Sequence, residues 1–155
     1  MNTKVWLDAD SCPVAVRDFV VKYAHNFSIK VVFVANKPIS ACFNDFEMIV
    51  CNTEKDAADN YILKHASQED LVITKDVIFA SKLIEKSITT INDRGTLFTK
   101  NNISEKLSDR DFDFQLAQIG LGGKKGSFYS KKEFLKFKEC FNKEMQRLLK
   151  NATSN

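Results

Sequence analysis

The sequence predicts an α/β fold, in the form of a single three-layer domain with a mostly parallel, doubly wound sheet. Short apolar runs alternate with segments of helical spacing over roughly the first 90 residues, a pattern typical of consecutive β-α-β units. The runs are apolar at successive positions, as strands covered on both faces require. A chain of 155 residues also has the usual size of one domain.

The first strand is expected at residues 4–8, where an apolar run ends at two carboxylates and Pro13. Proline suits a first helical position because its fixed φ is already helical and its missing N–H would be unpaired there. A helix should therefore occupy residues 13–25. The later elements are expected in this order: strands at 29–35 and 46–50, a helix at 57–65, a strand at 71–74, a helix at 77–86 and a weaker strand at 88–91.

The last third of the chain has a different pattern. Two helices are expected at residues 103–107 and 111–119, followed by a loop at 120–126 that holds four of the five glycines. Ser130 and Glu133 have the spacing of a capping box, which begins a long helix with one apolar face. We expect residues 1–150 to form one domain and residues 151–155 to be a frayed tail.

Composition narrows the function classes. The four cysteines show no C-x-x-C spacing and no neighbouring histidine cluster, so neither a zinc site nor a disulfide framework is expected. No apolar run approaches the ~20 residues of a membrane span, and no secretory signal is evident, so we expect a cytoplasmic protein without a membrane partner. A net charge of +3 permits a polyanion partner without requiring one.

Polar residues gather where the predicted strands end. Asp8 and Asp10 follow the first strand, Asn36 the second, Asp76 the fourth and Arg94 the fifth. The carboxyl ends of parallel strands share one edge of a sheet, which is where α/β proteins bind ligands. Carboxylates crowded at one edge repel one another unless a proton or cation lies between them, and Mg²⁺ or Mn²⁺ is the expected cation.

Asp56 and Asp59 are three residues apart at the start of the predicted helix at 57–65 and could reach the same edge. Structural roles would also explain several of these acids. Asp56 or Asp76 could cap the helix that follows it, and Asp59 would be a favourable first-turn acid. For Asp8 and Asp10 together a cap is a weaker explanation, because capping needs only one carboxylate.

With these residues in view, the chain resembles the YaiI/YqxD family of small bacterial proteins over about residues 5–150. The motifs that carry the resemblance are DADSCP at 8–13, VAN at 34–36, DAADN at 56–60, DLVITKD at 70–76, NDRG at 92–95 and LSDRDF at 107–112. The family is similar in fold to PIN-like nucleases, a Rossmann-like group. That similarity implies metal-binding acids at Asp8, Asp59 and the Thr74-Lys75-Asp76 segment.

The leading hypothesis is a Mg²⁺- or Mn²⁺-dependent phosphodiesterase or nuclease acting on RNA or another nucleic acid. The expected catalytic residues are Asp8, Asp10, Asp59 and Asp76, and Asp56 joins them as a metal ligand. The expected substrate-binding residues are Ser11, Asn36, Thr74, Lys75, Arg94 and Lys124. Two alternatives stay open: a haloacid-dehalogenase-like phosphatase with Asp8 as nucleophile, and a non-catalytic module that binds nucleic acid or a nucleotide.

Overall fold

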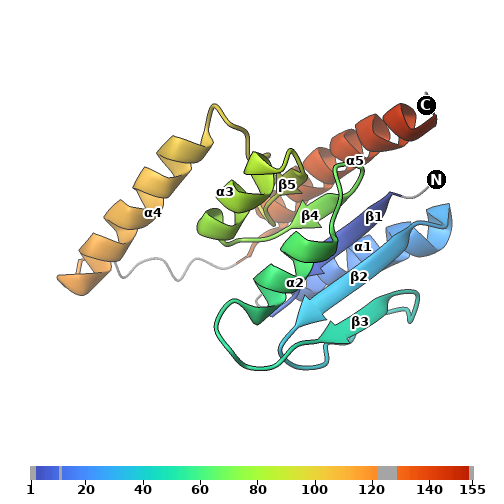
Figure 1. The fold of residues 1–155 in the computed structure, drawn as a ribbon, viewed down its shortest axis with the longest axis horizontal. Helices are drawn as coiled ribbons and strands as arrows, with labels where there is room; N and C mark the ends of the chain where they lie inside the picture. The colour runs from blue at the N-terminus through green and yellow to red at the C-terminus, as the bar shows by residue number, and fades with distance from the viewer. Residues whose placement is uncertain (1–2, 11, 122–128, 154–155) are drawn as a thin grey trace.

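The described residues form a five-stranded sheet in which every strand runs parallel to its neighbours (Figure 1). The computed structural model describes residues 3–10, 12–121 and 129–153. The strands are β1 (Lys4–Asp8), β2 (Lys30–Ala35), β3 (Glu47–Val50), β4 (Leu71–Ile73) and β5 (Thr89–Ile91), and their order across the sheet is β3-β2-β1-β4-β5. The predicted α/β class and the central position of the first strand are confirmed.

Helices cover both faces of the sheet, so the domain has three layers. On one face lie α1 (Val14–Phe27) and α5 (Lys131–Thr153), whose apolar side chains pack with Val5, Leu7 and Phe33. On the other face lie α2 (Ala57–His65) and α3 (Val77–Glu85), which pack with Trp6, Val32 and Val72. Successive residues of β1 therefore enter two different cores, which is why residues 5–7 are all apolar.

Strand register places the carboxyl ends of the central strands side by side. Asp8 is paired with Val34 of β2, and Leu7 is paired with Ile73 of β4. The residues that follow β4 therefore lie beside Asp8, and those that follow β2 lie beside Ala9 and Asp10. The switch in strand order falls at β1, the position at which an open α/β sheet leaves a crevice for ligands.

Two predictions about the last third of the chain need correction. Residues 103–119 were expected to form two helices, but α4 (Ile103–Gln118) is one continuous helix. Residues 108–110 are polar and broke the apolar spacing, yet an exposed helix tolerates polar residues without interruption. In addition, α5 continues to Thr153, so residues 151–153 of the expected tail are helical.

None of the described helices combines the length and the apolar composition of a membrane-spanning segment.

Candidate functional site

Asp8 ends the central strand and is the middle of the site. Its carboxylate Oδ2 accepts a hydrogen bond of 2.8 Å from the hydroxyl of Thr74, which follows β4 and is 1% exposed. Burial raises the pKa of Asp8, the Thr74 hydrogen bond opposes that rise, and the charges of Asp10 and Asp76 add to it. Asp8 is thus a partly desolvated acid with two acidic neighbours.

Asp10 is exposed and faces the end of β2. Both of its carboxylate oxygens lie 3.1 Å from the backbone nitrogen of Asn36, which donates to them. The backbone of Asn36, and not only its side chain, therefore takes part in the site, because it fixes the direction of the Asp10 carboxylate.

Asp76 is the N-cap of α3, as the structural alternative predicted. Its Oδ1 accepts from the backbone N–H of Phe79 at 3.1 Å, and its own backbone N–H donates to the Thr74 hydroxyl oxygen at 3.1 Å. Thr74 thus links Asp76 to Asp8 through a single hydroxyl group. The cap uses only Oδ1 of Asp76, and the charge of the carboxylate still acts on Asp8.

The first turn of α2 contributes two further acids. Asp56 has a left-handed backbone (φ 62°) and makes no side-chain cap to α2, so its carboxylate is not used as a cap. Asp59 has its pKa raised to about 7, first by burial and then by the charges of Asp8, Asp76 and Asp56; Lys82 opposes this. The α2 acids therefore share one electrostatic environment with the acids that follow β1 and β4.

A cavity of about 140 Å³ lies between the ends of β1 and β2 and the start of α2. Asp8, Asp10, Asp56 and Asp59 line it together with Asn36, Asn52 and Glu54. Asn52 and Glu54 were not predicted as site residues, although both belong to the polar segment that leads into α2. Five carboxylates in so small a space make it a strong attractor for a cation.

Among the described residues, no three histidine, cysteine, aspartate or glutamate side chains are placed to hold one metal ion together. Hydrogen bonds within the protein already engage two of the acids. One oxygen of Asp76 accepts from the first turn of α3, and both oxygens of Asp10 accept from the Asn36 backbone.

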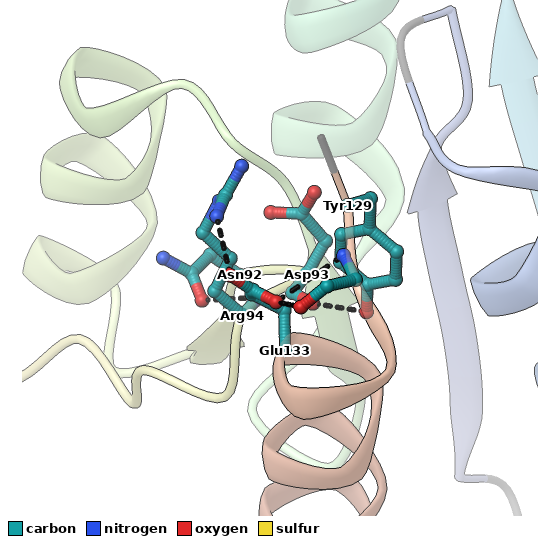
Figure 2. A network of polar contacts seen from close by, with 6 residues as sticks. Asn92, Asp93, Arg94, Tyr129 and Glu133 are labelled. Carbon is teal, nitrogen blue, oxygen red and sulfur yellow. Dashed lines mark hydrogen bonds and ion pairs between the residues drawn. The ribbon is translucent and has the colours of Figure 1, made fainter. Parts of the chain in front are cut away.

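A second polar group lies at the same edge of the sheet, around the turn after β5 (Figure 2). Asp93 is 3% exposed, and burial raises its pKa while Lys75 and Arg94 oppose the rise. The Tyr129 hydroxyl donates to the backbone oxygen of Asp93 at 2.5 Å. Cys12 lies near Asp93, and burial together with that charge raises the pKa of its thiol to about 12, which makes it a poor nucleophile.

Two residues predicted to bind substrate belong to this second group. Lys75 is exposed, and its charge acts on Asp93 and Cys12. Arg94 forms an ion pair of 3.5 Å with Glu133 at the start of α5. Gly95, which follows Arg94 in the turn, has φ 83°, and a Cβ there would lie 2.5 Å from the backbone oxygen of Lys136, so only glycine fits.

The remaining predicted residues have different outcomes. Thr74 is buried and engaged with Asp8 and Asp76, so it orients acids at the base of the site. Ser11 and Lys124 lie outside the described residues. Asp70, part of the same sequence motif as Asp76, lies at the opposite end of β4, where it accepts from Lys4, Trp6 and Ser67.

Comparison with known proteins agrees with the resemblance seen in the sequence. The family model described as "Uncharacterized BCR, YaiI/YqxD family" matches residues 6–149. The chain belongs to this family. It is 39% identical to a UPF0178 protein of Treponema denticola over 147 residues, which cover 95% of this chain and 94% of the relative. No solved structure matches it.

Two further relatives extend the likeness over nearly the whole chain. A UPF0178 protein of Treponema pallidum is 36% identical over 96% of this chain and 84% of the relative. One of Psychromonas ingrahamii is 35% identical over 96% of this chain and 99% of the relative. The match to the YaiI/YqxD family thus covers nearly the whole chain, including the segment that holds the candidate site.

Proposed function

We propose that this YaiI/YqxD protein is a Mg²⁺- or Mn²⁺-dependent phosphodiesterase that acts on RNA or another nucleic acid at the acidic cavity. One observation carries the proposal: Asp8 and Asp59, from different elements, are both desolvated, and the charges of neighbouring acids raise the pKa of each still further. Crowding of this kind destabilises an empty site and is relieved by a divalent cation.

The donor set fits magnesium or manganese better than zinc. Carboxylate and amide oxygens surround the cavity, and these are the ligands of hard cations. Mg²⁺ usually keeps several waters and binds through one or two carboxylates plus substrate phosphates, so it does not need a cage of three protein ligands. Asp8 and Asp59 would hold the cation, with Asp10, Asp56 and Asp76 adding charge around it.

The other residues would prepare the site for a phosphodiester. Thr74 holds the Asp8 carboxylate in one orientation, and the Asn36 backbone does the same for Asp10. When bound, the cation supplies an electrophile that activates water and offsets charge on phosphate oxygens. Lys75 is exposed at the same edge and would contact the phosphate. Arg94 would do so only after leaving Glu133. Ser11 and Lys124, which lie outside the described residues, stay predicted phosphate-binding residues.

The phosphatase alternative has less support from this geometry. It would need Asp8 as an ionised nucleophile and the Thr74 hydroxyl as a phosphate ligand. The Thr74 hydroxyl donates its proton to Asp8 and accepts from the Asp76 N–H, so both of its hydrogen-bonding functions are engaged inside the protein.

A cleavage assay tests the proposal. Single-stranded RNA, single-stranded DNA and a duplex are incubated with the parent, Asp8→Asn and the control Glu69→Gln, with Mn²⁺ or with EDTA. Glu69 is exposed and precedes β4 at the opposite end of the sheet. We expect Mn²⁺-dependent cleavage by the parent and by Glu69→Gln, and none by Asp8→Asn.

Other outcomes identify the alternatives. Release of inorganic phosphate from a monoester, without cleavage of any oligonucleotide, would favour the phosphatase. Nucleic-acid binding that survives EDTA, without cleavage of any substrate, would favour the non-catalytic module. Cleavage that Asp8→Asn retains in full would exclude the acidic cavity as the active site.

A further inference from the structure

Helix α4 is not covered by the rest of the described chain. It stands away from the body of the molecule in Figure 1, and none of its residues is buried. Its first residue, Ile103, packs against the small cluster of Ala80, Ile84 and Phe98 beside α3. From Ser108 to Gln118 every residue of the helix except Leu116 is exposed, although at 16 residues the helix is about 24 Å long.

The uncovered part of α4 carries large apolar side chains on two opposite sides. Phe112, Leu116 and Ile119 recur at helical spacing along one side, and Phe114 continues the line of Ile103 and Leu107 on the other. Phe112 is 60% exposed, Phe114 58% and Ile119 69%. A helix that is apolar on opposite sides is typical of one that lies between other elements, because one side alone would satisfy a surface position.

An apolar groove lies between α1 and α5, on the other face of the sheet. Its volume is about 860 Å³, and its walls include Phe19, Tyr23, Phe27 and Leu149. Phe27 is 60% exposed, so the groove presents an aromatic ring to solvent. Lys22 and Lys138 stand at its sides, and the described residues that line it include no acid.

The charges of α4 and of the groove are complementary. Glu105, Asp109, Asp111 and Asp113 give α4 four carboxylates against the two cations Lys106 and Arg110. The groove offers two lysines and no carboxylate among its described residues. The helix combines apolar side chains with acids, and the groove combines an apolar floor with lysines. These are complementary surfaces of the kind that helix-in-groove recognition uses. The same acids would repel a nucleic acid.

The groove cannot be filled by α4 of the same chain while α4 keeps its own contacts. The first turn of α4 is fixed beside α3, which covers one face of the sheet, whereas α1 and α5 cover the other. We infer that α4 docks in the α1–α5 groove of a second copy of this chain. If each copy gives one helix and one groove, the two identical contacts close a symmetric dimer.

Charge reversal tests this dimer directly. One variant, the arm variant, reverses the charge of α4 by Asp109→Lys, Asp111→Lys and Asp113→Lys. The other, the groove variant, reverses the charge of the α1–α5 groove by Lys22→Glu and Lys138→Glu. Light scattering after gel filtration should give the parent twice the monomer mass of 17.7 kDa. Each variant alone should be a monomer, because lysines would meet lysines in the first and acids would meet acids in the second.

Mixing the two variants is the decisive step. In the mixed pair each reversed arm meets a reversed groove, and each native arm meets a native groove, so the mass should return to that of a dimer. Leu135→Ser serves as a control, since Leu135 is 52% exposed on α5 and does not line the groove; it should leave the dimer intact. Far-ultraviolet circular dichroism checks that every variant is folded.

Three results would overturn the inference. These are a parent that stays monomeric at every concentration tested, a parent dimer that survives both reversals, and a mixture of the folded variants that stays monomeric. A mass that grows beyond two copies would also overturn it, because an open chain of contacts would then replace the closed pair.

Discussion

Thr74 donates a hydrogen bond of 2.8 Å to Asp8 across 66 residues of sequence. The contact follows from the parallel pairing of β1 with β4, in which Leu7 is opposite Ile73 and the next residue of each chain segment is therefore Asp8 and Thr74. One buried hydroxyl thus sets the direction of the central acid and, through its oxygen, receives the Asp76 N–H at the start of α3.

Thr74→Val should destabilise the protein by about 1–2 kcal/mol near neutral pH, because the Asp8 carboxylate loses its buried donor. The Thr74 hydrogen bond lowers the pKa of Asp8, so its loss raises that pKa further. A folded-state pKa above the unfolded value means that stability falls as pH rises, and the valine variant should lose more at alkaline pH than at acidic pH. Urea unfolding of both proteins at several pH values measures this.

Thr74→Ser is the matched control, because it keeps the hydroxyl and removes only a methyl group. It should follow the pH profile of the parent at a slightly lower free energy of unfolding. Equal losses in the valine variant at acidic and alkaline pH would show that the Thr74 hydroxyl does not act on the ionisation of Asp8.

The fold could be predicted from sequence because its main determinants are local. Residues 5–7 are apolar in succession, which is typical of a strand buried on both faces, and the short length of the run favours a strand over a helix. Pro13 was expected at the first helical position, but it is the N-cap of α1, with an extended ψ of 144°, and the helix begins at Val14. The continuity of α4 could not be predicted in the same way. None of its residues is buried, so its apolar residues do not need to follow one face without interruption.

The site was predictable only in part. Because the carboxyl ends of parallel strands share one edge of the sheet, Asp8, Asp10 and Asp76 were expected at that edge, and the structure places them there. Side-chain direction was not accessible, since it depends on which backbone N–H groups are free nearby: Phe79 takes one oxygen of Asp76, and Asn36 takes Asp10. The deep burial of Asp93 was also missed, because it depends on Tyr129 and α5 closing over the turn.

Asp70 provides a prediction that separates structural acids from site acids. It is 3% exposed and accepts hydrogen bonds of 2.9 Å from the Lys4 backbone, the Trp6 indole and the Ser67 backbone. Asp70→Asn replaces one acceptor oxygen with an NH₂ group that faces a donor, which should cost about 2 kcal/mol. The melting temperature should fall by ~4–8 °C, while the stabilisation by Mn²⁺ stays unchanged. A lost Mn²⁺ response in a folded variant would contradict this separation.

Asp59 should make stability depend on pH. Its folded-state pKa of about 7 lies above the ordinary aspartate value of 3.8, so between these values the native state binds more protons than the unfolded state. The contribution of Asp59 to stability is therefore present at acidic pH and is lost as pH rises through about 7. Asp59→Asn removes this loss and should be more stable than the parent above pH ~7.

The expected gain is modest because Asp59 is only half-buried and solvent screens its charge. We expect about 1 kcal/mol, or ~2–4 °C in melting temperature for a chain of this size, and no gain near pH ~4. Melting curves of the two proteins across this range, without metal, measure the difference. Parallel profiles would show that Asp59 ionises normally in the folded protein.

Asp10→Asn examines the proposed cation site at its exposed side. The amide keeps one oxygen that can accept from the Asn36 N–H, so the local fold should persist. The substitution also removes a charge that raises the pKa of Asp8, so the metal-free variant should be at least as stable as the parent. The parent should gain ~2.7 kcal/mol when Mn²⁺ is present at about 100 times its dissociation constant.

Asp10→Asn should lose most of that gain, because a cation binds less tightly to a cavity with one carboxylate fewer. Glu69→Gln, which also removes one acid but at the far end of the sheet, should keep it. Thermal melts of the three proteins with and without Mn²⁺ compare the responses at equal protein concentration. The same Mn²⁺ response in the parent and in Asp10→Asn would remove Asp10 from the cation site and leave it as an acceptor for the Asn36 backbone alone.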